Sequence, residues 1–209
     1  MAFSVPSFAV AVSFGVLAHT LHWGLIAPLV CSAIVFSASA QFAIAGVLGG
    51  GGGPAAAIVA ALLVNARFAP MGIAVASSLK GGTLRRAIEA QATNDASWAL
   101  ANQGGGRFNR ELLIGATLPQ FVAWVGGTAL GLLAGDAVGN PTTFGLDVIF
   151  PAFFLGLLLD ELRQGAAHVG AALIAGSVAL ASLPLAPPGV PIIAACVGAL
   201  LPLLPLRLR

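Results

Sequence analysis

An amide, a guanidinium and a helix-breaking proline lie close together inside a long apolar stretch, residues 55–79: they are Asn65, Arg67 and Pro70. A stretch of this length can cross a bilayer, because a transmembrane helix needs about 20 apolar residues. An arginine near the middle of the bilayer costs at least about 2.5–3.5 kcal/mol on insertion scales. We therefore expect a carboxylate, a water-filled cavity or a bound anion to offset the charge of Arg67.

On an unbroken helix, Asn65 and Arg67 would point about 200° apart, because each residue turns the helix by about 100°. Pro70 lacks a backbone donor and clashes with the carbonyl four residues back, which belongs to Ala66. We therefore predict a break between Ala66 and Pro70 that turns Asn65 and Arg67 towards one cavity. Arg67 would there neutralise a substrate carboxylate or a protein carboxylate; the alternative is a static ion pair that locks two helices together.

A second polar group interrupts the apolar residues 25–48, at Ser37, Ser39 and Gln41. Ser37 and Gln41 are four residues apart and would share a helix face. The small residues at 37–40 allow close approach of another backbone. The pattern fits two roles equally: a substrate site at an unwound helix, or hydrogen-bonding groups that join helices. We take these three residues, with Asn65 and Arg67, as the candidate substrate-binding set.

Two further places carry candidate coupling or ion-pairing residues. Asn94 and Asp95 follow a basic stretch, and Asp147 precedes Pro151 by four residues. The latter spacing repeats the arrangement at Pro70, because Pro151 clashes with the carbonyl of Asp147. The alternative for all three polar residues is a solvated loop or an interfacial position.

The composition assigns the chain to the polytopic α-helical membrane proteins. Of its 209 residues 58% are hydrophobic and 8% are charged, whereas a soluble domain carries about 25% charged residues. One transmembrane transporter domain is predicted to cover residues 1–209. Its seven apolar segments, some of which we expect to be broken or re-entrant, lie at residues 3–22, 25–48, 55–79, 112–134, 145–159, 166–183 and 190–206.

The polar residues 80–111 form a segment predicted to lie in the cytoplasm. Within it, residues 83–103 could form one amphipathic or partly inserted helix. With seven spans, eight of the nine Lys and Arg residues, all but Arg67, fall on the side of this segment, and basic residues favour the cytoplasm. We therefore predict an exterior N-terminus and a cytoplasmic C-terminus. One re-entrant early segment would move the N-terminus inside and leave the rest unchanged.

The sequence offers no sign of an enzyme, a metal or another cofactor. His19, His22 and His168 are too scattered for a metal motif, and no nucleophile–base signature occurs. The glycines at 49–53 lack the Lys and Ser/Thr of a phosphate-binding loop. The net charge of +2 gives no indication of nucleic-acid binding.

Five short motifs, in order along nearly the whole chain, resemble the AzlC family, the large subunit of branched-chain amino acid exporters. They are the small-residue Gln-Phe motif, the Asn-x-Arg motif, a Thr-Asp-Glu-like motif, a Trp-x-x-Gly-Thr pattern and Leu-Asp followed by Pro-Ala-Phe. They match Ser37 to Phe42, Asn65 to Arg67, Thr93 to Asp95, Ala123 to Thr128, and Leu146, Asp147 and Pro151 to Phe153.

This resemblance implies a proton-coupled, multi-pass exporter of leucine, isoleucine, valine or similar apolar amino acids in a bacterial plasma (inner) membrane. Its partner would be a small, hydrophobic AzlD-like subunit. Arg67 would hold the substrate carboxylate. Asp95 or Asp147, or carbonyls freed near Pro70 and Pro151, would hold the ammonium. The alternatives are a channel or permease for another small solute and a membrane assembly subunit that transports nothing.

Overall fold

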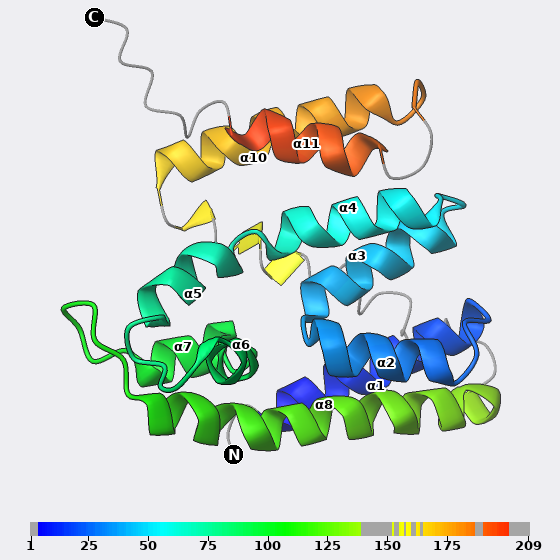
Figure 1. Ribbon diagram of the computed structural model, residues 1–209. Helices are drawn as coiled ribbons and strands as arrows, with labels where there is room; N and C mark the ends of the chain where they lie inside the picture. Colours follow the sequence, from blue (N-terminus) through cyan, green and yellow to red (C-terminus); the bar gives the residue numbers. More distant parts are fainter. Residues whose placement is uncertain are drawn as a thin grey trace, which may run out of the picture.

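The computed structural model describes residues 4–138, 152, 155–156, 158–159, 162–163, 165–186 and 190–200. These residues form ten helices and contain no strand beyond an isolated bridge between Asn102 and Phe108. The prediction of an all-α fold is therefore confirmed. The helices stack in layers, with α8 and α1 at the bottom of Figure 1, α3 and α4 above them, and α10 and α11 at the top.

Helices α1 (Ser4–Thr20) and α8 (Arg110–Val138) form the most closely packed pair. The contact depends on the absence of side chains. A Cβ built on Gly15 would lie 2.3 Å from a backbone oxygen of α8, and one on Gly131 would lie 2.1 Å from the oxygen of Val12. Small residues spaced by four let helices approach this closely. On α8 they are Gly127, Gly131 and Gly135.

The two helices run parallel, as polar contacts at their two ends show. Near the N-terminal end of α1, Gln120 donates to Ser7 at 2.9 Å. At the other end, His19 Nε2 lies 3.0 Å from Asp136 Oδ1. The N-terminal ends of α1 and α8 are therefore on the same side of the molecule.

The second apolar segment is broken into α2 (Ile26–Val35) and α3 (Ala38–Gly49). Phe36 ends α2 with a left-handed backbone, φ 41°, a conformation that costs a residue with a large side chain some free energy. Ser37 is extended, and its side chain accepts from the Ala40 backbone N–H to cap α3. The break therefore has a local cause, namely the capping serine.

The chain turns back after α2, so α2 and α3 form a helical hairpin (Figure 1). The end of α3 returns to the end of α1, because a Cβ on Gly49 would lie 3.1 Å from the Leu21 side chain. At about 1.5 Å per residue, the 10 residues of α2 and 12 of α3 are each too short to cross a bilayer, which takes about 20.

The third apolar segment is broken as well, into α4 (Pro54–Asn65) and α5 (Phe68–Val75), which are bent by 48°. The interruption lies at Ala66 and Arg67, and Pro70 is the third residue of α5. A proline is tolerated in the first turn of a helix because its missing N–H would have no partner there. The break lies at the N-terminal edge of the range that the sequence predicts.

The polar segment differs from the prediction, because residues 83–103 form two helices instead of one. They are α6 (Thr83–Ala90) and α7 (Asp95–Ala101). Asn94 starts α7 with a capping box, in which its side chain accepts from the Ser97 N–H and the Ser97 hydroxyl accepts from the Asn94 N–H. Such a box specifies a new helix start, which a reading of hydrophobic periodicity alone did not include.

Helices α10 (Ala166–Ser182) and α11 (Val190–Leu200) pack on each other, and α11 also contacts α4. They correspond to the last two predicted apolar segments. Asp147 and Pro151, and most of the predicted segment 145–159, lie outside the described residues.

Among the described residues, one helix is long and apolar enough to cross a membrane, α8 between Arg110 and Ala137. The bent pair α4–α5 qualifies when it is counted as one span, and α1, α2, α3 and α10 are shorter apolar helices. For helices that cross one bilayer, the parallel α1 and α8 place the chain's N-terminal side with the polar segment. This arrangement fits the alternative that the sequence left open, in which one re-entrant early segment moves the N-terminus to the side of the polar segment. The side of the membrane on which each terminus lies stays a prediction.

Glu89 fixes the polar segment to the start of α8. Its carboxylate, 8% exposed, accepts from Arg85 Nε at 2.9 Å and from Arg110 Nε at 2.7 Å. Hydrogen bonds from Arg110 above all lower the pKa of Glu89 from 4.5 to about 2.

The ion pairs of Glu89 should make the stability of the protein depend on acid. Because the pKa is lower in the folded protein, the stabilisation is complete above about pH 4.5 and is lost as the pH falls towards about 2. Glu89→Gln should lower the thermal unfolding midpoint of detergent-solubilised protein at pH 7 and flatten this acid dependence. Glu111→Gln, at an exposed position of the same region, is the control. Equal unfolding midpoints for wild type and Glu89→Gln at pH 7 would contradict the prediction.

Candidate functional site

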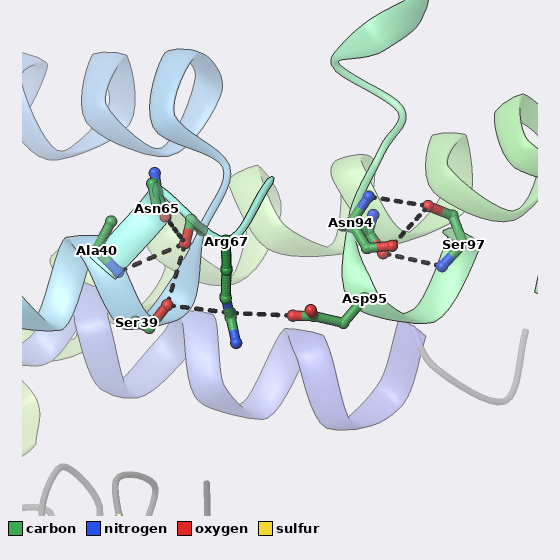
Figure 2. A network of polar contacts seen from close by, with 8 residues as sticks. Ser39, Ala40, Asn65, Arg67, Asn94, Asp95 and Ser97 are labelled. Atoms are coloured by element: carbon green, nitrogen blue, oxygen red, sulfur yellow. Dashed lines mark hydrogen bonds and ion pairs between the residues drawn. The ribbon is translucent and has the colours of Figure 1, made fainter. Parts of the chain in front are cut away.

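Arg67 lies at the centre of a polar cluster between two broken helices (Figure 2). Its Nη2 lies 3.0 Å from Asp95 Oδ2 and donates to Ser39 Oγ at 3.2 Å. The guanidinium carbon is 5.0 Å from the centre of the Phe68 ring, a cation–π geometry. The Arg67 side chain is 39% exposed and that of Asp95 is 61% exposed, so both charges can be reached from outside the protein core.

The break in the third segment brings Asn65 to the same place as Arg67. The Ser37 hydroxyl donates to Asn65 Oδ1 at 2.8 Å and lies 3.3 Å from the Ser39 hydroxyl. The two serines are in the first turn of α3, which presents free N–H groups and the positive end of its dipole. The structure thus brings together four of the candidate substrate-binding residues, Ser37, Ser39, Asn65 and Arg67.

Asn94 positions Asp95 and is itself buried. Besides capping α7, its side-chain amide lies 3.5 Å from Thr117 of α8. Asp95 is the first residue of α7, where the helix dipole favours a carboxylate. Asn94 therefore determines where the Asp95 carboxylate stands relative to Arg67.

A cavity of about 260 Å³, called here the polar cavity, opens beside the Arg67–Asp95 pair. It holds a cation, a carboxylate, an amide and hydroxyls within reach of one another, as a small zwitterion requires. Within the part of the chain that the structure describes, no three His, Cys, Asp or Glu side chains gather into a group that could hold a metal ion. The lining residues are Pro6, Ser7, Val10, Phe36, Ser37, Ala38, Arg67, Phe68, Asn94, Asp95, Ala96, Gln120 and Trp124.

Gln41, a candidate substrate-binding residue, is fully buried and does not line the polar cavity. Its Nε2 donates to Ser32 at 2.8 Å and its Oε1 accepts from Trp124 Nε1 at 2.8 Å. Ser32 also lies 2.8 Å from the Thr128 hydroxyl. These contacts join α2, α3 and α8, so the geometry favours a structural role for Gln41.

Replacement of Gln41 should therefore affect folding more than chemistry. Gln41→Leu leaves the Trp124 N–H without its acceptor inside the protein, and a buried unsatisfied polar group costs about 1–3 kcal/mol. We expect a lower thermal unfolding midpoint, with unchanged ligand affinity in the molecules that remain folded. Gln103→Leu, at an exposed loop position, is the control. A loss of ligand affinity at an unchanged unfolding midpoint would contradict this prediction and would show that Gln41 takes part in substrate binding.

Sequence reasoning did not identify several groups that the structure places in or behind the site. Phe36 and Phe68 line the polar cavity, while Ser32, Thr117 and Thr128 hold its walls through hydrogen bonds. Trp124 and Thr128 are four residues apart, a spacing that places both on one helix face. Phe36 and Phe68 gave no such signal, because phenylalanine is common in any apolar segment.

Comparison with known proteins identifies the chain's relatives. A family model described as AzlC protein matches residues 2–138. An uncharacterised membrane protein of Archaeoglobus fulgidus is 35% identical over 179 residues, which cover 82% of this chain and 76% of the relative. The branched-chain amino acid transport protein AzlC of Bacillus subtilis is 28% identical over 180 residues, 81% of this chain and 69% of the relative. No solved structure matches the chain. The chain therefore belongs to the AzlC family of membrane transport proteins.

Proposed function

We propose that this protein is a secondary transporter that exports branched-chain or other apolar amino acids. Membership of the AzlC family supports a membrane transport role. The Bacillus subtilis relative is named a branched-chain amino acid transport protein, which supports this substrate class. Residues Ser37, Ser39, Asn65, Arg67 and Asp95 would form the site for the amino and carboxyl groups that all amino acids share.

The observation that carries the proposal is the accessible ion pair of Arg67 and Asp95 beside a helix break. A zwitterionic amino acid can exchange partners with this pair, so that its carboxylate binds Arg67 and its ammonium binds Asp95. Exposed ion pairs stabilise a protein by only about 0–1 kcal/mol. A substrate can therefore open the pair at little cost, which a buried structural lock would not allow.

The fold supports a multi-pass arrangement for this transporter. In this arrangement α1, α4–α5 and α8 cross the bilayer, and the α2–α3 hairpin enters and returns on one side. Discontinuous helices are a common way to build a substrate site near the middle of a membrane. The basic residues of the polar segment favour a cytoplasmic location for it, and the proposal puts the N-terminus on the same side. A cytoplasmic C-terminus and location in the plasma membrane complete the proposal.

Proton coupling and a small hydrophobic partner subunit are further parts of the proposal. A proton on Asp95 would remove the charge that holds Arg67, and so would link protonation to the state of the site. Exposed apolar side chains on α8 offer contact surface for lipid or for a partner; they include Leu118, Val122 and Leu133.

The function can be tested by the fate of amino acids released inside cells. Cells that lack their own exporters are fed dipeptides of leucine, valine or alanine, with and without this gene and the gene of its candidate partner. Expression should lower the intracellular concentration of the released apolar amino acid. Flux should saturate and should fall when the proton gradient is dissipated, unlike flux through a channel. Equal concentrations of every amino acid with and without the genes would contradict the proposal.

A further inference from the structure

A second cavity, of about 490 Å³, adjoins the polar cavity on the other side of the helix breaks. We call it the apolar cavity. The two share Phe36 and Phe68 as lining residues. Asn65 lines the apolar cavity and accepts from Ser37, which lines the polar one. The two volumes are therefore neighbouring compartments that meet at these two aromatic rings.

The lining of the apolar cavity differs in chemistry from that of its neighbour. No ionised side chain lines it, and its polar members are Asn65, Gln91 and Thr93. The remainder are aliphatic or aromatic residues and one glycine. They are Ile34, Val35, Phe36, Ile44, Ile58, Ala61, Leu62, Phe68, Gly72 and Ala90.

The Phe36 and Phe68 rings each contact side chains that do not line the apolar cavity. The Phe36 ring meets Phe121 at 5.2 Å and Trp124 at 6.4 Å between ring centres, in edge-to-face geometry. The Phe68 ring lies under the Arg67 guanidinium. A ligand bound at Arg67 would therefore lie next to a ring that also lines the apolar cavity, so the two compartments can act on one molecule.

We propose that the apolar cavity receives the side chain of the transported amino acid while Arg67 and Asp95 hold its charged groups. This inference rests on the proposed function and adds the residues that determine specificity. The division of labour explains how a site with few polar groups can prefer leucine to alanine, since the charged groups of the two are identical. In an apolar pocket, each methylene changes selectivity by about 10–200-fold.

Gly72 allows a direct test of this assignment. It lines the apolar cavity on α5, and a Cβ added there would meet no atom within 4 Å. Gly72→Leu therefore adds a side chain beside the cavity without a backbone clash. Gly115→Leu is the matched control, because a Cβ on Gly115 also meets no atom within 4 Å and this residue lies on α8 away from both cavities.

The readout is the ratio of leucine export to alanine export, measured in cells that contain both subunits. In Gly72→Leu the ratio should fall about 10-fold or more, because the filled cavity excludes leucine and still admits alanine. In Gly115→Leu the ratio should stay at the wild-type value. The converse variant, Leu62→Ala, enlarges the cavity at an exposed residue and should favour larger side chains, such as phenylalanine over leucine.

Failure of this inference differs from failure of the transport function. An unchanged ratio in both Gly72→Leu and Leu62→Ala, in cells where the wild type exports leucine, overturns the side-chain site and leaves the transporter. A parallel loss of leucine and alanine export in Gly72→Leu assigns the cavity to another occupant, such as a partner helix, and also overturns it. A wild type that exports no amino acid overturns the function, and the inference with it.

Discussion

Arg67→Ala should reduce amino acid export by at least about 30-fold while the protein still folds and inserts. The pair that Arg67 would form with a bound substrate carboxylate is enclosed by the ligand and the cavity. Loss of one partner of a buried, hydrogen-bonded charge pair costs about 2–5 kcal/mol in binding, and each 1.4 kcal/mol is tenfold. The loss should be equal for leucine, valine and alanine, because Arg67 meets only the carboxylate that they share. Export from dipeptide-fed cells measures the effect, and size-exclusion chromatography in detergent reports folding.

Three companion variants separate substrate binding from a static helix lock. Arg107→Ala, at an exposed position in the polar segment, should export normally. Arg67→Lys keeps the charge but loses the planar fork that fits a carboxylate, so its activity should be intermediate. Asp95→Asn should weaken export and its dependence on the proton gradient. A static lock instead predicts that Arg67→Ala and Asp95→Asn lower the unfolding midpoint equally, with normal export per folded molecule.

Gly131→Leu should strongly lower the yield of folded protein. Even a Cβ at this position would lie 2.1 Å from the Val12 oxygen and 2.9 Å from the Gly15 Cα. Backbone atoms cannot move aside as the end of a flexible side chain can, so α1 and α8 must separate. Overpacking of a well-packed core costs about 1–3 kcal/mol and occasionally more, and we expect the upper end because the obstacle is backbone. The yield of monodisperse protein after extraction measures the effect.

Gly126→Leu is the control for this prediction. It lies on the same helix five residues earlier, and a Cβ there meets no atom within 4 Å. Its yield and unfolding midpoint should match the wild type. Wild-type yield from Gly131→Leu would mean that α1 and α8 are not in contact through Gly15 and Gly131.

The parts of the site that sequence could predict are those with strong local causes. Pro70 fixes a missing hydrogen bond, so a break before it followed from backbone chemistry. The prediction that Asn65 and Arg67 face one cavity differs from the structure, in which Asn65 lines the apolar cavity and Arg67 lines the polar cavity. The high apolar content specified helices that need partners for every buried polar group. The pairing of Arg67 with Asp95 was one of several open choices, because the partner of a charge depends on tertiary packing.

Other features depended on whether a polar residue continues a helix or caps a new one, which the hydrophobic periodicity of the sequence does not reveal. Ser37 could continue a helix or cap a new one, and the cap turned one apolar segment into a hairpin. Asn94 and Ser97 did the same in the polar segment. The small-residue contact of α1 and α8 had a signal that was not used, the spacing of Gly127, Gly131 and Gly135. Glycines at intervals of four residues predict that α8 packs closely against another helix.

The 48° bend between α4 and α5 has a mechanical consequence. Arg67 stands at the pivot, whereas Val75 at the far end of α5 packs in a cluster with Ala92 and Ala101, which flank Asp95 on either side. Helix α5 is 8 residues, or about 12 Å, long, so a swing of about 10° shifts its far end by about 2 Å. That displacement is enough to part a 3.0 Å ion pair. A change in this bend angle is therefore expected to change the distance between Arg67 and Asp95, which links the shape of the α4–α5 pair to the state of the site.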